Sequence, residues 1–339
     1  MIKLLYRNYF ITLFLLLGVI TCLGQKNVSK SPKPLMMYSD SSRLGRPFAK
    51  DPFVIHFKGR YLMYYSVPEY KDQNGVNHGW GIGIAESHNL TAWKRIGDIN
   101  VDPLALYESK GFCAPSALVI GGVVHLFYQT YGNARKDAIC HAMSTDGITF
   151  TRDLTNPIFH PTGNWNCGRA IDAEVFKFNK NYFLFFATRD SAYKIQIQGV
   201  ASASLLTSFH RNEWTQLTDK PILKPEYPWE DKCIEGAALC RHDNLLYMFY
   251  AGAYNNFPQQ IGVAKSTDGV QWTKLSYKPF LSNGAPGEWN SSESGHPNLF
   301  TDNNGRTYLF YQGNNDKGKT WFLSMVEVKW NDKGPYLSK

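Results

Sequence analysis

The chain has 339 residues, enough for one large domain or two ordinary domains with a sizeable hydrophobic core. Its composition is 43% hydrophobic and 15% aromatic, which excludes a disordered chain and favours a fold rich in β-structure. The formal net charge is +8, but the basic residues are scattered along the chain, so the sequence predicts no nucleic-acid partner.

The first 24 residues have the features of an export signal. Two basic residues precede an apolar run at 10–20, and small residues follow it. This run is too short for a membrane span, so we expect an exported protein, periplasmic or extracellular, without a membrane-spanning segment. VITC, which ends at Cys22, resembles a lipoprotein cleavage site, so a lipid anchor in the outer membrane stays an open alternative. Residues 25–45 are predicted to be a linker or N-terminal segment in front of the folded domain.

Five segments of the remaining chain share one plan: a short apolar strand, a polar turn, and an aromatic strand that ends in small residues. The first strands begin at Asp51, Pro115, Asp172, Glu235 and His296. Each segment is followed by a third strand with small residues, such as GIGIAES at 81–87. A fourth element then carries an aromatic residue, namely Trp93, Phe150, Trp214, Trp272 or Trp330.

Four antiparallel strands per unit of about 60 residues, repeated five times, predict an all-β fold, a five-bladed β-propeller with four strands in each blade. We expect one propeller domain at 46–339. Two of the predicted turns read STDG, at 144–147 and 266–269, which is good hairpin chemistry. The tryptophans of the fourth elements recur at one position of the blade, so they are predicted to lie in the core.

In a propeller the first strand of each blade lies innermost, so the strand heads converge around one end of the central channel. Asp51, Asp172 and Glu235 are therefore expected to meet there, together with His296. Carboxylates in a sheltered pocket repel one another, which pushes their pKa values apart. One acid can then keep its proton while another stays ionised. Breaking a glycosidic bond requires this pair of states.

Aromatic residues and an arginine precede the strand heads and predict a sugar-binding mouth. Flat rings suit the C–H faces of sugars, although each ring could equally pack a loop. The candidate aromatic residues are Phe112, Trp165, Trp229 and Trp289. Arg169 is expected to orient Asp172 or to balance its charge. Glu174 lies on the same face of the strand as Asp172 and is predicted to contact a neighbouring blade.

These residues resemble the motifs of glycoside hydrolase family 43, the five-bladed propeller glycosidases, over essentially all of the chain after the signal. Asp51 in AKDPFVI is similar to the family's general base and Glu235 in CIEGAAL to its general acid. Asp172 in AIDAEVF is similar to the aspartate that orients the acid and tunes its pKa. FCAPSAL resembles the family's Trp-Ala-Pro-Asp stretch, with Cys113 and Ser116 replacing the tryptophan and the aspartate.

The resemblance implies hydrolysis with inversion, usually of α-L-arabinofuranosides or β-D-xylosides in plant or algal oligosaccharides or polysaccharides. Asp51 would deprotonate water and Glu235 would protonate the leaving oxygen, with their carboxyl groups roughly 6.5–9.5 Å apart. His296 in SGHPNLF is similar to the family's channel histidine, which often binds a metal-linked water. No cofactor is expected to be required, and a calcium ion in the channel is an open alternative.

Two other functions stay open from the sequence. One is a non-catalytic glycan-binding propeller that keeps the aromatic residues. The other is a related propeller clan, such as the hydrolases of agar or galactan oligosaccharides, since the borders among these families depend on loop residues. The fructan-hydrolase motif Asn-Asp-Pro-Asn-Gly is absent, which disfavours that clan. Exo action is favoured if the long loops at 68–79 and 254–260 narrow the pocket.

Overall fold

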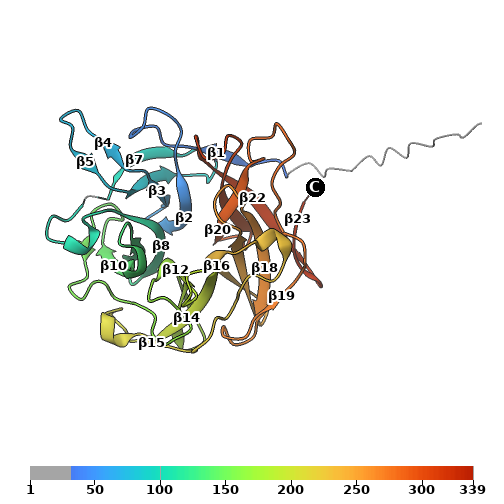
Figure 1. Ribbon diagram of the computed structural model, residues 1–339. Helices are drawn as coiled ribbons and strands as arrows, with labels where there is room; N and C mark the ends of the chain where they lie inside the picture. The colour runs from blue at the N-terminus through green and yellow to red at the C-terminus, as the bar shows by residue number, and fades with distance from the viewer. Residues whose placement is uncertain (1–31, 100, 339) are drawn as a thin grey trace, which may run out of the picture.

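The computed structural model describes residues 32–99 and 101–338, and this part of the chain folds into five main antiparallel sheets around one axis (Figure 1). This arrangement confirms the predicted five-bladed β-propeller, an all-β fold. The expected export signal at 1–24, including Cys22, lies outside the described residues. No helix in the described ranges is long and apolar enough to cross a membrane.

In the first four blades, the four strands follow one another in the chain. Blade 1 contains β2 (Lys50–Phe57), β3 (Arg60–Val67), β6 (Gly81–Ser87) and β7 (Lys94–Asp98), and blade 2 contains β8 (Phe112–Ile120), β9 (Val123–Thr130), β10 (Ile139–Ser144) and β11 (Thr151–Arg152). Blade 3 contains β12 (Ile171–Phe178), β13 (Asn181–Arg189), β14 (Gln196–Ser204) and β15 (Thr215–Gln216), and blade 4 contains β16 (Ile234–His242), β17 (Leu245–Gly252), β18 (Gln260–Ser266) and β19 (Thr273–Lys274).

Blade 5 contains β20 (Glu293–Thr301), β21 (Thr307–Asn314) and β22 (Phe322–Asn331), and both β1 (Met36–Tyr38) and β23 (Gly334–Leu337) pair with β22. The remaining short elements are a hairpin of β4 (Tyr70–Lys71) and β5 (Asn77–His78), and the 3-10 helices η1 (Leu106–Glu108), η2 (Ala134–Lys136), η3 (Arg211–Glu213) and η4 (Pro228–Glu230).

The innermost strands close a ring, because β2, β8, β12, β16 and β20 each contact the next and β20 contacts β2. A strand from the other end of the chain completes blade 5, where Met36 of β1 lies opposite Met325 of β22. This corrects two expectations. The segment at 25–45 is not only a linker, because β1 belongs to the propeller. Trp330 lies within the third strand of its blade rather than in a fourth element.

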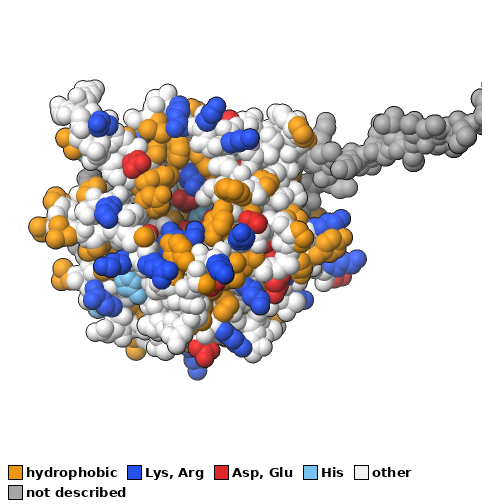
Figure 2. All heavy atoms as spheres, in the orientation of Figure 1, with side chains coloured by type: hydrophobic (Ala, Val, Ile, Leu, Met, Phe, Trp, Pro, Cys, Tyr) orange, Lys and Arg blue, Asp and Glu red, His pale blue; other side chains and the backbone are white. Residues whose placement is uncertain are grey.

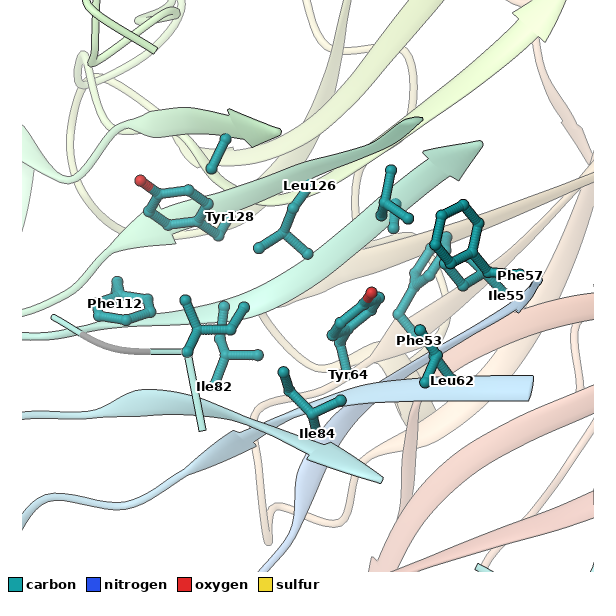
Figure 3. Close-up of a cluster of buried hydrophobic side chains, with 14 of the residues drawn as sticks. Phe53, Ile55, Phe57, Leu62, Tyr64, Ile82, Ile84, Phe112, Leu126 and Tyr128 are labelled. Carbon is teal, nitrogen blue, oxygen red and sulfur yellow. The ribbon is translucent and has the colours of Figure 1, made fainter. Parts of the chain in front are cut away.

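The core lies between the blades rather than inside one layer, because each sheet buries both of its faces. In β2, Phe53, Ile55 and Phe57 pack towards blade 2, where they meet Leu126 and other apolar side chains (Figure 3). The alternate residue Val54 faces blade 5. Five such clusters fill the five junctions of the ring.

The tryptophans predicted to recur in the core do so. Trp93, Trp214 and Trp272 each pack at the edge of one of the interblade clusters. The STDG turns also join blades: the Tyr64 hydroxyl of blade 1 donates a hydrogen bond to the Gly147 carbonyl of blade 2 at 2.9 Å. The recurring sequence features therefore hold neighbouring blades together.

Candidate active site

Each innermost strand has the same irregularity near its head, a bulge that shifts the register with the second strand of the blade. One residue of every bulge has a left-handed backbone, with φ between 45° and 59°. These residues are Asp51, Ala114, Asp172, Gly236 and His296. For a residue other than glycine this conformation costs about 1–3 kcal/mol, and a bulge re-aims the side chain that it carries.

Hydrogen bonds across blade junctions hold three of these strained positions in place. The Asp51 amide donates to Gln312 Oε1 at 2.9 Å, and the Asp172 amide donates to Gln129 Oε1 at 2.7 Å. The Ala114 amide donates to Ser66 Oγ at 2.8 Å. In each case the acceptor comes from the preceding blade of the ring, so closure of the ring supports the geometry of the site.

The bulges correct two of the predicted strand heads. In blade 2 the repeated position is Ala114 rather than Pro115. In blade 4 it is Gly236, which leaves Glu235 one residue earlier, in the register that Lys50 holds in blade 1. A carboxylate at the position of Gly236 would have to adopt the left-handed backbone itself. Glu235 avoids that strain and still reaches the channel.

The strand heads surround one cavity of about 220 Å³ at an end of the central channel. The predicted site residues that line it are Asp51, Arg169, Asp172, Glu235 and His296. Figure 2 shows the hollow near the centre of this face, with acidic side chains inside it and basic side chains around its mouth. Asp51, Asp172 and Glu235 are only 7–8% exposed, so the three carboxyl groups share a largely water-excluded space.

Asp51 is held in its ionised form. Burial alone would raise the pKa of its carboxyl, but the charges of His296 and Lys50 and a hydrogen bond with Ser66 bring the pKa below its ordinary value. His296 Nδ1 lies 3.3 Å from Asp51 Oδ1. A buried carboxylate that keeps its negative charge can accept a proton from water.

Two glutamine side chains donate hydrogen bonds to the Glu235 carboxyl. The Gln259 amide donates to Glu235 Oε1 at 2.6 Å, and the Gln196 amide donates to Glu235 Oε2. Both glutamines are buried, so neither bond competes with bulk water. The orientation of the Glu235 carboxyl is therefore fixed by blades 3 and 4 before any ligand binds.

Asp172 has the opposite tendency to Asp51. Its burial and the nearby Glu235 carboxylate raise the pKa of Asp172 to about 7. Asp172 therefore keeps its proton up to near-neutral pH, while Asp51 is ionised. Arg169 acts in the opposite direction and slightly favours the ionised Asp172, but its ion pair is with Asp137, at 3.6 Å. The expected role of Arg169 is thus only partly met.

The four aromatic residues expected at the mouth do not line the cavity. Phe112 is 1% exposed and packs between blades 1 and 2. The other three lie in loops that fold over their own blades, namely Trp165 against Phe186, Trp229 against Tyr250 and Trp289 against Tyr311.

Glycines in the strands make room for two of these rings. A β-carbon at Gly262 would lie 2.8 Å from the Trp229 ring, and one at Gly313 would lie 2.6 Å from the Trp289 ring. These rings pack against their own blades, remain partly exposed and do not line the cavity. The aromatic lining of the cavity comes instead from Trp80, Tyr131 and Tyr254.

The donor set does not fit a directly ligated metal ion. Calcium takes six to eight oxygen ligands, whereas His296 contacts Asp51 and the described residues contain no group of three His, Cys, Asp or Glu side chains that could hold an ion.

Glu174, the next carboxyl group along the channel, accepts hydrogen bonds from Ser116 Oγ at 3.2 Å and from the Leu239 amide at 3.4 Å. These bonds confirm the predicted contacts of Glu174 with neighbouring blades.

The fold and the cavity together define a class of protein, the five-bladed propellers with an acid-lined pocket at one end of the channel. Residues 44–335 match the sequence model of the family described as "Glycosyl hydrolases family 43". The chain belongs to this family, whose members are glycoside hydrolases that invert the anomeric configuration and typically need no cofactor.

Individual relatives are distant. A crystal structure of a thermostable family-43 glycoside hydrolase has a TM-score of 0.68 at 20% identity and covers 89% of this chain and 96% of its own. An α-L-arabinofuranosidase from Lactobacillus brevis has a TM-score of 0.66 at 20% identity, with 91% and 96% covered. A curated β-1,2-mannobiose phosphorylase from Thermoanaerobacter sp. (strain X514) is 29% identical over 134 residues, which cover 35% of this chain and 42% of that enzyme.

Proposed function

We propose that this protein is an exported glycosidase that cleaves plant or algal glycans with inversion, as an exo-acting α-L-arabinofuranosidase or β-D-xylosidase. The observation that carries the proposal is the meeting of Asp51, Asp172 and Glu235 on one buried cavity, from three blades of a family 43 propeller. The structure of the arabinofuranosidase from Lactobacillus brevis shares this fold.

Asp51 is proposed as the general base. Its carboxylate takes a proton from a water molecule while the water oxygen attacks the anomeric carbon from the face opposite the leaving group. The neighbouring His296 and Lys50 charges support this role because they keep Asp51 ionised. The attack inverts the configuration of the sugar that is released.

Glu235 is proposed as the general acid. It donates its proton to the glycosidic oxygen as the bond to the anomeric carbon breaks, so the leaving sugar departs as a neutral alcohol. Gln196 and Gln259 fix the direction of its carboxyl group. Asp172 is proposed to orient the acid, because burial and the nearby Glu235 carboxyl raise the pKa of Asp172, so that Asp172 carries a proton beside Glu235.

Exo action is supported by the size of the cavity. Its volume of about 220 Å³ is below the roughly 300–1,000 Å³ of pockets for drug-sized ligands, so it is too small to enclose a long segment of a glycan. Tyr254 and Asn255 of the loop at 254–260 contribute to its wall, and so does Trp80, which follows the loop at 68–79. A pocket narrowed by loops accepts the end of a chain more readily than its middle.

The experiment that tests the proposal is a hydrolysis screen with aryl glycosides and with plant and algal polysaccharides. The wild type should release a monosaccharide from at least one arabinofuranoside or xyloside substrate, and Glu235→Gln should not. Glu174→Gln is the matched control, because Glu174 is another buried glutamate of an innermost strand but does not line the cavity. Binding of glycans without release of any sugar would instead support the non-catalytic alternative.

Export is proposed from the sequence pattern at 1–24. The proposal can be tested by expressing the full chain in a Gram-negative host and locating it by cell fractionation. A periplasmic or extracellular product with the first 24 residues removed is expected. Retention of the label from a radioactive fatty acid, and its loss on Cys22→Ser, would identify the alternative lipid anchor.

A further inference from the structure

We propose that Arg169, Arg189 and Tyr254 form an oxyanion-binding subsite for an acidic sugar unit on the leaving-group side of the cleaved bond. The inference rests on the proposed function and extends it, because it assigns a chemical class to the part of the glycan that is not released. The ligand would be a carboxylate carried by the glycan, such as that of a uronic acid.

The first observation is a set of hydrogen-bond donors without acceptors on one wall of the cavity. Arg189 Nε and the Tyr254 hydroxyl are buried and have no hydrogen-bond partner within the described part of the chain, whereas Arg169 Nε has only a long contact with Asp137, at 3.6 Å. Burying a donor without an acceptor is unfavourable. The two unpartnered donors line the cavity, which indicates that a ligand supplies their acceptors.

The second observation is the charge of this wall. The guanidinium of Arg189 makes no ion pair with the described residues and lies over the rings of Tyr193, at 4.5 Å, and Tyr254, at 5.2 Å. These two rings hold the guanidinium without neutralising it. Arg169 is only partly balanced by Asp137, because their closest approach is 3.6 Å. Guanidinium groups bind carboxylates and phosphates through paired, charge-assisted hydrogen bonds, and a carboxylate is the one of these that a sugar unit itself can carry.

The three groups line the same cavity, and the Arg189 guanidinium lies 5.2 Å from the centre of the Tyr254 ring. Burial raises the pKa of Tyr254 to about 12, and the positive charges of both Arg189 and Arg169 act on the same hydroxyl in the opposite direction. The third cation of the cavity, Lys50, belongs elsewhere, because its nearest charges are Asp51 and Glu293. The unmatched positive charge is therefore concentrated on the side of Arg169, Arg189 and Tyr254.

The position of the wall relative to Glu235 determines which sugar it meets. Arg189 lies opposite Gln196 in the β13–β14 ladder, and Gln196 donates to the Glu235 carboxyl. Tyr254 follows β17, in which Ala251 lies opposite Glu235. The general acid faces the leaving oxygen, so groups beside it contact the leaving sugar rather than the sugar that is released.

Binding of free sugars tests the subsite without requiring turnover. D-galacturonate and D-glucuronate, each with its neutral methyl ester as the matched probe, would be titrated into the wild type by calorimetry at low ionic strength. Each acid should bind at least about tenfold more tightly than its ester, which corresponds to charge-assisted hydrogen bonds to one carboxylate. Arg189→Met should reduce this preference to about twofold or less.

Two further variants separate recognition from folding. Tyr254→Phe removes only the unpartnered hydroxyl and should weaken the preference for the acid by about threefold. Arg306→Met is the control, because Arg306 also lies over a tyrosine ring but is exposed and paired with Asp302 at 3.0 Å. It should keep the full preference. If Arg189→Met lowers the melting temperature strongly, Arg189→Lys and Tyr254→Phe supply the test.

Equal affinity of the wild type for acid and ester would overturn the proposal, and so would an Arg189→Met variant that keeps the preference. Inorganic phosphate that binds more tightly than either uronate would also overturn it, because the arginines would then serve a free anion. Failure of the hydrolysis screen together with an intact preference would refute the proposed catalysis alone. Hydrolysis without any preference would refute this subsite alone.

Discussion

The hydrogen bond from Gln196 to Glu235 can be tested by a substitution that has a closely matched control. Gln196 and Gln198 lie two residues apart on β14, so their side chains share one face of the strand, and both are fully buried. Of these two glutamines, only Gln196 donates a hydrogen bond to the Glu235 carboxyl. Both side-chain polar atoms of Gln198 lack a hydrogen-bond partner within the described ranges. Gln196→Leu and Gln198→Leu are therefore matched in size, burial and strand.

The expected loss follows from the bond that is removed. A hydrogen bond to a charged group contributes about 1.5–3 kcal/mol, so Gln196→Leu should lower kcat/KM by about 10- to 100-fold. The loss should lie mainly in kcat, because Gln196 orients the acid. Gln198→Leu should keep full activity and raise the melting temperature, since it replaces a buried unsatisfied amide with an apolar side chain of similar size.

The assay compares two leaving groups on the sugar that the wild type releases. A glycan leaving group needs the proton of Glu235, whereas a dinitrophenolate is a weak base and departs without it. The defect of Gln196→Leu should therefore be large on the glycan and small on the dinitrophenyl glycoside. An equal defect on both substrates, or an equal defect in Gln198→Leu, would refute the reasoning that Gln196 acts through the acid.

Three further predictions concern the carboxyl groups. Asp51→Asn should lower kcat by about 10²- to 10⁴-fold with little change in KM or melting temperature, and near-wild-type turnover would exclude it as the base. Because the pKa of Asp172 is raised to about 7, kcat/KM should fall as the pH rises through this value, when Asp172 loses its proton and places a second negative charge beside Glu235, and Asp172→Asn should remove this limb of the pH profile. Burial raises the pKa of Glu174 to about 8, so its contribution to stability is complete at acidic pH and is lost as the pH rises through about 8. Calorimetric melting temperatures of Glu174→Gln should therefore gain on the wild type between pH 5 and pH 8, and a constant difference would contradict the buried carboxyl.

The architecture was predictable because the repeated residues are those that pack between the blades, and not those that carry out the chemistry. Alternating apolar strands, small residues in the third strands and recurrent tryptophans such as Trp93 and Trp272 all satisfy the same interblade junction. The strand β1 was missed because three residues, Met36–Tyr38, have too little pattern to be told from a linker. Their partner strand lies almost the whole chain away.

The carboxyl groups of the site were found because strand heads converge in any propeller, whatever their sequence. The predicted aromatic residues do not line the cavity, and the reason is physical. The spacing of a ring before a strand head does not indicate whether the ring points to the axis or folds over its own blade. Gly262 and Gly313, which leave space for Trp229 and Trp289, were the available signal for the second case.

The hairpin formed by the first two strands of each blade explains the other residues that line the cavity. The end of each second strand lies beside the head of the first, so residues at that end also reach the channel. Arg189 ends β13, and Tyr131 and Tyr254 come just after β9 and β17. Gln196 begins the third strand opposite Arg189. These positions could have been read from the repeat, but the direction of each side chain depends on the bulges, which the sequence does not mark.

The anomeric configuration of the first product is the most direct test of the roles assigned to the carboxyl groups. Proton NMR of the released sugar, recorded in the first minutes of hydrolysis by the wild type, resolves the anomer before it equilibrates. Water activated by Asp51 opposite a leaving group protonated by Glu235 predicts the anomer opposite to that of the substrate. A first product that keeps the configuration of the substrate would contradict the account, because it would require a covalent step that none of these roles provides.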